Sequence, residues 1–128
     1  MSTKRPDHGA AAVEFALVLP LLIALLLGII EFGYAMYVQA TIAGAAREGA
    51  RTLAITSSTA SAQQAALAAA LPAITLDASE VAADNSLCST ANPSAAVTVK
   101  ISYPYSGIAG LLPNGITISG TGVMRCGG

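Results

Sequence analysis

Apolar residues form an uninterrupted run over residues 16–30 and continue less densely to position 38. Counted over residues 15–38, this stretch holds about 24 residues, and about 20 in a helix cross the hydrocarbon core of a bilayer. The pattern therefore predicts a transmembrane helix. The helix is expected to continue outside the membrane, so that it covers residues 10–55, with Pro20 bending it or opening it locally.

A second, shorter helix is predicted over residues 60–71, which are mostly alanine. The Ser-Ser-Thr sequence at 57–59 ends the first helix. Thr59 or Ser61 can cap the second one, because a hydroxyl accepts a hydrogen bond from a free backbone amide of the first turn. Pro72 is expected to stop this helix.

Strands are predicted in the last third of the chain. Apolar and polar residues alternate over 97–103 and again over 116–124, which is typical of strands with one buried face. A weaker strand is expected within 74–88, and proline and glycine predict a loop over 104–115, whose apolar residues would pack on the sheet or on a partner. The predicted fold class is α+β: a long N-terminal transmembrane helix, a short second helix and a small antiparallel sheet of about three strands.

Composition divides the chain into parts. Charged residues make up 10% of it, against about 25% in an ordinary soluble domain, and the apolar excess lies mainly in the long helix. We expect a polar leader at 1–9, a transmembrane and assembly helix at 10–55, and a small extracytoplasmic domain at 56–128. Lys4 and Arg5 precede the span, so the positive-inside rule places the N-terminus in the cytoplasm and the rest of the chain on the far side.

Several classes of function have no support in the sequence. A net charge of −1 gives no electrostatic basis for binding nucleic acid. The single histidine, His8, lies in the leader, and Asp77, Glu80 and Asp84 do not have the spacing of a calcium-binding loop. We therefore predict no enzymatic activity, no cofactor and no metal site.

Two cysteines, Cys88 and Cys126, lie in the region that would be exported. In an oxidising compartment, two such cysteines are expected to form one disulfide. A bond closing a loop of about 38 residues would stabilise the domain by about 3–4 kcal/mol. The alternative is a pair of free thiols.

A single carboxylate, Glu14, stands at the entrance to the apolar run. A charge inside a bilayer is costly, about 2.5–3.5 kcal/mol at its centre, so an opposite charge is expected nearby. Cleavage after Gly9 would create an amino group at Ala10, four positions before Glu14, and in a filament the amine could come from a neighbouring subunit. A secretory signal differs, because its cleavage site follows the apolar region.

The outer end of the span carries a further carboxylate and two tyrosines. Tyr34 and Tyr37 suit the membrane interface, where a phenol ring can keep its hydroxyl in water. We interpret Glu31 as a marker of that interface, where a carboxylate costs little. An intersubunit contact is the alternative.

Small residues recur along the long helix. Spacings such as Ala24/Gly28 and Ala45/Gly49 allow helices to approach closely, and their continuation past the membrane edge indicates helix-on-helix packing. Two glycines of the span and three charged residues beyond it are the predicted helix-packing positions: Gly28, Gly33, Arg47, Glu48 and Arg51. Glu48 and Arg51 are spaced to pair, whereas the two arginines share a face and need an outside carboxylate or solvent.

Together these segments resemble the TadE-like family. The resemblance rests on residues 9–16, Pro20, the Glu-Phe-Gly sequence at 31–33 and the segment 45–51, with further likeness in the two stronger strands. It implies a pilin-like fold and a minor pseudopilin of a tight-adherence (Tad, Flp-type) adhesive pilus. It also implies a single-pass protein of the bacterial inner membrane whose partners are a prepilin peptidase, other pilins and the inner-membrane assembly platform.

The resemblance also assigns roles to individual residues. Gly9 would precede the scissile bond, Ala10 would be the new N-terminus, Glu14 would be the assembly glutamate and Phe15 the aromatic residue beside it. Family members often have tyrosine where this chain has Phe15. The alternative function is an uncleaved, single-pass membrane-anchored protein whose extracytoplasmic domain binds a partner.

Overall fold

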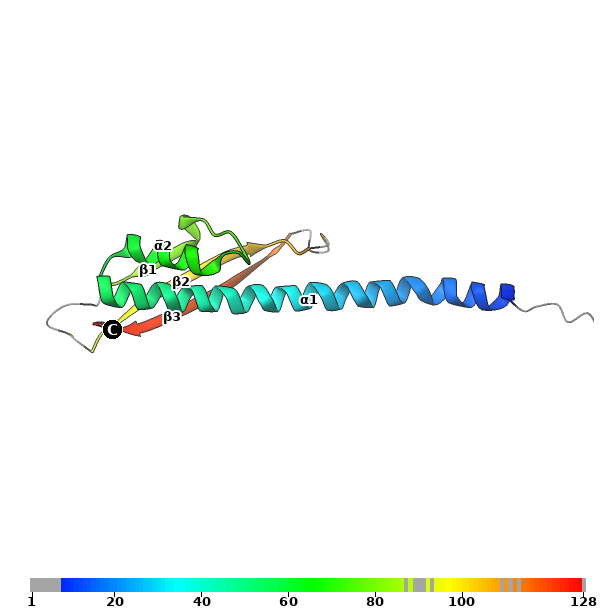
Figure 1. Cartoon of the computed structure of the whole chain (residues 1–128), viewed down its shortest axis with the longest axis horizontal. Helices are drawn as coiled ribbons and strands as arrows, with labels where there is room; N and C mark the ends of the chain where they lie inside the picture. Colours follow the sequence, from blue (N-terminus) through cyan, green and yellow to red (C-terminus); the bar gives the residue numbers. More distant parts are fainter. Residues whose placement is uncertain are drawn as a thin grey trace, which may run out of the picture.

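A helix of 49 residues, α1 (His8–Thr56), dominates the structure. The computed structural model describes residues 8–86, 88, 92, 94–108, 110, 112 and 114–127. After α1 come α2 (Thr59–Ala70), a 3₁₀ turn (Ala78–Glu80) and the strands β1 (Val81–Asp84), β2 (Ala96–Tyr105) and β3 (Ile116–Arg125). Figure 1 shows α2 and the sheet gathered along the C-terminal half of α1, while its N-terminal half projects alone. The predicted α+β fold class is confirmed.

The two halves of α1 have different surroundings. Every residue from 9 to 30 is exposed, although this segment is almost entirely apolar. From Val38 onward the helix buries one or two side chains in each turn, as expected for a helix with one face on a core: Val38, Ile42, Ala45, Ala46, Ala50, Leu53 and Ala54. The helix is about 74 Å long and passes from one environment to the other without a break.

The bounds of α1 differ slightly from the prediction. The helix begins at His8, inside the predicted polar leader, because neither His8 nor Gly9 stops a helix that the following residues favour strongly. The expectation for residues 1–7 lies outside the described residues. The backbone stays helical through Pro20, so the loss of one amide donor there does not end the helix.

The three strands form one antiparallel sheet in the order β1–β2–β3. Val81 pairs with Ile101, and Ala96 pairs with Arg125 at the other end of the longer pair. The alternating side chains of β2 are buried against the helices, which confirms that this strand has one buried face: Val97, Val99, Ile101 and Tyr105. The core therefore lies between this sheet and the helix pair α1 and α2.

Strand β2 runs farther than predicted. Pro104 and Tyr105, which we assigned to the loop, belong to the strand and pair with Thr117 and Ile116 of β3. Proline is tolerated here because the pairing of β1 with β2 extends no farther than Ile101, so no described strand pairs with that edge of β2 beyond it.

The start of α2 also corrects the prediction. Ser58, not Thr59 or Ser61, is the N-cap, and its side chain accepts a hydrogen bond from the Ser61 amide at 3.3 Å. Serine is well suited to this position because its hydroxyl satisfies an amide that has no partner within the helix. The helix ends at Ala70, just before Pro72, as predicted.

The predicted disulfide is confirmed. Cys88 is bonded to Cys126, with their Cα atoms 5.8 Å apart. The bond ties the segment before β2 to the end of β3, and both cysteines pack against the edge of the core. A further backbone contact, from the Gly127 amide to the Ala54 carbonyl at 3.2 Å, holds the same chain end to α1.

Candidate functional site

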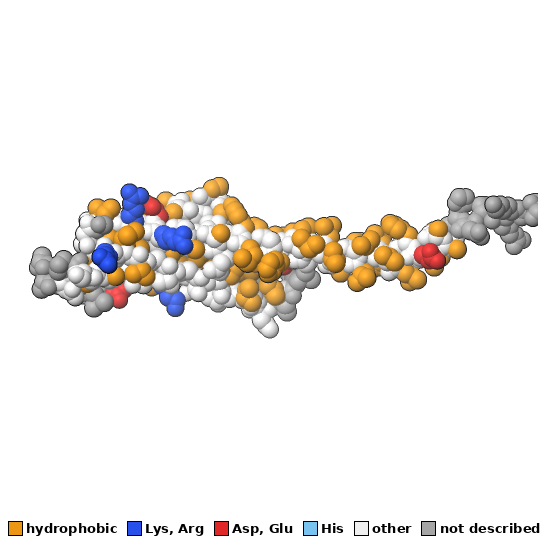
Figure 2. Space-filling view, turned by 90° about the horizontal axis from the view of Figure 1, so that it is seen from below, with side chains coloured by type: hydrophobic (Ala, Val, Ile, Leu, Met, Phe, Trp, Pro, Cys, Tyr) orange, Lys and Arg blue, Asp and Glu red, His pale blue; other side chains and the backbone are white. Residues whose placement is uncertain are grey.

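The predicted processing and assembly residues lie together at the start of α1. Gly9, Ala10, Glu14 and Phe15 are all exposed, and Phe15 keeps 61% of its surface accessible. Within the part of the chain that the structure describes, Glu14 has no hydrogen-bond or ion-pair partner. Figure 2 shows one acidic patch near the tip of the apolar helix. The segment therefore offers an unpaired charge and an apolar surface to another molecule.

The predicted helix-packing glycines fall into two groups. A Cβ added at Gly28 or at Gly33 would meet nothing within 4 Å, so both positions are open for contact with another helix. Gly49 differs, because a Cβ there would lie 3.2 Å from Ala66 of α2 and from Val99 of β2. The small-residue surface beyond the span is therefore partly used inside the chain, where α2 and the sheet lie on it.

The charged residues near the end of α1 are exposed. Arg47, Glu48 and Arg51 point away from the core, and the predicted ion pair between Glu48 and Arg51 does not form. At the surface such a pair would contribute little to stability. These three side chains are accessible to solvent or to a partner, and their role in helix packing stays a prediction.

Glu31 makes a contact that the sequence did not reveal. Its carboxylate accepts a hydrogen bond of 2.7 Å from the hydroxyl of Tyr105 and further bonds of 3.0 and 3.1 Å from the amide of Ile108. Gly107 permits this approach, since it has φ +82° and a Cβ there would lie 2.5 Å from a Glu31 oxygen. Glu31 therefore fastens the end of the β2–β3 hairpin to α1, instead of only marking the interface.

Three tyrosine rings lie in a row that begins at this contact. The ring of Tyr34 lies 6.0 Å from that of Tyr105 and 6.1 Å from that of Tyr37, measured between centroids. Burial, followed by the hydrogen bond to Glu31, raises the pKa of Tyr105 to about 12. The hydroxyl of Tyr105 therefore stays protonated, and able to donate, throughout the physiological range of pH.

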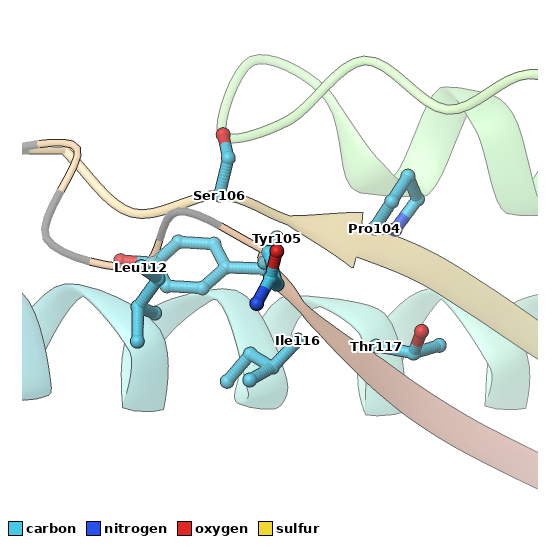
Figure 3. A pocket seen from close by; sticks show the side chains of 8 residues that line it. Pro104, Tyr105, Ser106, Leu112, Ile116 and Thr117 are labelled. Atoms are coloured by element: carbon cyan, nitrogen blue, oxygen red, sulfur yellow. The ribbon is translucent and has the colours of Figure 1, made fainter.

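A cavity of about 320 Å³ opens beside this contact, between the ends of β2 and β3. Figure 3 shows Tyr105, Leu112 and Ile116 among the side chains around it. The lining residues that the structure describes carry no charged group: Pro104, Tyr105, Ser106, Leu112, Asn114, Gly115, Ile116 and Thr117.

The acidic residues of the domain do not converge. No group of three histidine, cysteine, aspartate or glutamate side chains that could hold a metal ion occurs among the described residues. Asp77 and Glu80 instead form a local capping pair around the 3₁₀ turn. A hydrogen bond from the Ser86 amide lowers the pKa of Asp84, so that carboxylate also serves a local turn.

The apolar half of α1 meets the requirements of a membrane span. A stretch within Gly9–Thr56 has a mean hydropathy of 2.7, and none of it is buried by the rest of the chain.

Comparison with known proteins gives one family. The model of the TadE-like protein family matches residues 9–51, whereas no curated protein and no solved structure matches the chain. The match covers about a third of the chain, and within residues 9–51 the protein is similar to the TadE-like family.

Proposed function

We propose that this protein is a minor pseudopilin-like subunit needed for assembly of a Tad (Flp-type) adhesive pilus. The observation that carries the proposal is the unshielded apolar segment 9–30 of α1, in which Glu14 is the only charged residue. A soluble domain would not leave such a surface uncovered, because large exposed apolar areas mark membrane or protein contacts. The TadE-like match covers the same residues.

In this proposal a prepilin peptidase cuts between Gly9 and Ala10, on the cytoplasmic side of the inner membrane. The new amino group then lies at the start of α1, and Glu14 follows it by one helical turn. Either the same chain or a neighbouring subunit can supply the amine that pairs with Glu14. Such a pair is a device for setting register between subunits more than a source of stability.

The exposed glycines and the distal domain complete the proposal. Gly28 and Gly33 leave open surface on the span where helices of other pilins or of the assembly platform can approach. The disulfide-closed domain lies on the outer side of the membrane, where oxidising conditions preserve the bond. The role is structural, with no catalytic step.

Processing is the property to test first. Intact mass and N-terminal sequence of the membrane-purified protein are compared between cells with and without the cognate prepilin peptidase. We expect a chain that begins at Ala10 only when the peptidase is present. Gly9→Val should abolish the cut. Gly28→Val is the matched control, because a Cβ at either glycine meets nothing within 4 Å and only Gly9 adjoins the scissile bond.

The opposite result favours the alternative function. If the full-length chain persists in both strains, the protein is a membrane-anchored module that keeps its leader. The exposed charged end of the domain would then be the first surface to examine for a binding partner.

A further inference from the structure

The end of the β2–β3 hairpin lies beside the last turns of the proposed span. By the hairpin end we mean residues 105–108, 112 and 114–116. Glu31 of α1 bonds directly to Tyr105 and Ile108, so the hairpin end and Glu31 occupy the same level along the helix axis. Leu112 packs against the core from the same end of the sheet.

The length of the free helix places that level at the membrane surface. A hydrocarbon core of about 30 Å is crossed by about 20 helical residues. A span of this length that starts near Val13 ends near Phe32, one residue beyond Glu31. It cannot extend much farther with lipid on all sides, because Tyr34 and Ala35 are already half-buried and Val38 is fully buried by the domain.

The charge pattern of the hairpin supports the same placement. Residues 101–124 contain no aspartate, glutamate, lysine or arginine. Figure 2 shows that most charged side chains gather instead over the broad end of the molecule, away from the apolar helix. The part of the domain nearest the span thus carries no charge that a bilayer interface would have to desolvate.

The hairpin end also exposes apolar side chains. Ile108 keeps 56% of its surface accessible and Ile116 keeps 48%. Tyr105 donates to Glu31, Tyr34 lies beside Tyr105, and Tyr37 lies beside Tyr34. Tyrosine favours the headgroup region because its ring is apolar and its hydroxyl is polar. An apolar, uncharged surface that continues a membrane span is suited to lipid.

We propose that the hairpin end lies in the outer headgroup region of the bilayer and that Ile108 inserts into lipid there. The domain would then rest on the membrane through two attachments, α1 and the hairpin end, with Glu31 joining them. The inference rests on the membrane span of the proposed function, although it does not depend on cleavage after Gly9.

Spin labels on single cysteines test this placement in the full-length chain, reconstituted at a low protein-to-lipid ratio in phosphatidylcholine vesicles. Labels are placed by Ile108→Cys, Ile55→Cys and Leu22→Cys, with the native disulfide verified by mass. Ile55 is the matched control, since it is also an exposed isoleucine but lies near the charged end of α1. Collision rates with oxygen, which concentrates in lipid, are compared with those of a water-soluble nickel chelate.

We expect the label at position 108 to favour oxygen severalfold over the chelate, as the label at position 22 should, while position 55 shows the reverse. A preference for the chelate at position 108 would overturn the inference and leave the hairpin end in water. Low rates with both reagents would overturn it in favour of a protein contact. If position 22 also favours the chelate, the span itself fails, and with it both this inference and the membrane anchoring of the proposed function.

Discussion

The hydroxyl of Tyr105, at the end of β2, donates a hydrogen bond of 2.7 Å to the carboxylate of Glu31 on α1, 74 positions earlier in the sequence. The same carboxylate accepts the amide of Ile108. One side chain of α1 thus satisfies two donors of the hairpin, and hydrogen bonds to a charged acceptor are stronger than those between neutral groups.

Removal of this contact should loosen the hairpin end. In Glu31→Ala we expect faster hydrogen exchange at the Ile108 amide and a loss of about 1–3 kcal/mol in unfolding free energy, because two donors lose a charged acceptor. Hydrogen-exchange mass spectrometry in detergent micelles measures the exchange at the Ile108 amide. Glu48→Gln, which alters an exposed carboxylate, serves as the control and should change neither. Unchanged protection at Ile108 in Glu31→Ala would show that the contact is dispensable.

Alkaline pH should weaken the same contact. The pKa of Tyr105 is raised to about 12 from an ordinary value of 10.0, so the folded state favours the protonated hydroxyl. The stabilisation from the contact between Tyr105 and Glu31 is complete below pH 10 and is lost as the pH rises toward 12. Absorbance titration of tyrosinate should show a late ionisation step for Tyr105, and Tyr105→Phe should remove that step. A late step that survives in Tyr105→Phe would assign it to another tyrosine.

The disulfide should contribute a large share of the stability of the domain. Cys88 and Cys126 close a loop of 38 residues, and the double variant Cys88→Ser/Cys126→Ser should lose about 3–4 kcal/mol. Denaturant unfolding followed by tyrosine fluorescence measures this difference. A reducing agent should destabilise the natural chain and leave the double variant unchanged. Equal stability of the two chains in oxidising buffer would contradict the prediction.

Close approach of β3 to α1 depends on glycine. A Cβ at Gly122 would overlap the backbone carbonyl of Ala46, so Gly122→Ala should force the strand away and cost about 1–3 kcal/mol. Gly28→Ala is the control, because a Cβ there meets nothing within 4 Å. The melting temperatures of the two variants should therefore differ clearly. If Gly122→Ala has the same melting temperature as the natural protein, β3 packs less closely on α1 than the structure indicates.

Glu14 should matter for assembly and not for folding. It is exposed and has no partner within the described chain, so Glu14→Gln should leave the unfolding free energy unchanged. Under the proposed function, the variant should be processed after Gly9 but should fail to support pilus assembly, since the amide cannot pair with an amine as a carboxylate does. Immunoblots of sheared pili against membrane fractions measure this. Glu48→Gln is the charge-matched control, and normal piliation by Glu14→Gln would count against a register role.

Local sequence patterns predict the elements of this fold well, and contacts between distant elements poorly. Alternation locates β2 and β3, because period-two burial is a property of the strand itself. Alternation does not predict that Pro104 belongs to β2, because proline is tolerated in that strand only beyond the point where the pairing with β1 ends. The partner of Glu31 could not be found from spacing, because Tyr105 and Ile108 reach it only through the tertiary fold.

The small-residue surface of α1 shows a second limit of sequence reasoning. Small residues at intervals of four predict close packing but not the packing partner. For Gly49 the partners are α2 and β2 of the same chain, whereas Gly28 and Gly33 stay open. Two glycines of β3 carry a further sequence signal of this packing. Gly120 and Gly122 alternate on one face of β3, and both lie directly on the backbone of α1.

The unbroken course of α1 has a mechanical consequence. No linker separates the exposed apolar half from the half that supports the sheet, and the helix continues through Pro20. A displacement of the first half along the helix axis must move the sheet by the same distance, and a rotation of one end turns the other. Whatever holds the N-terminal turns therefore also sets the height and the facing of the distal domain.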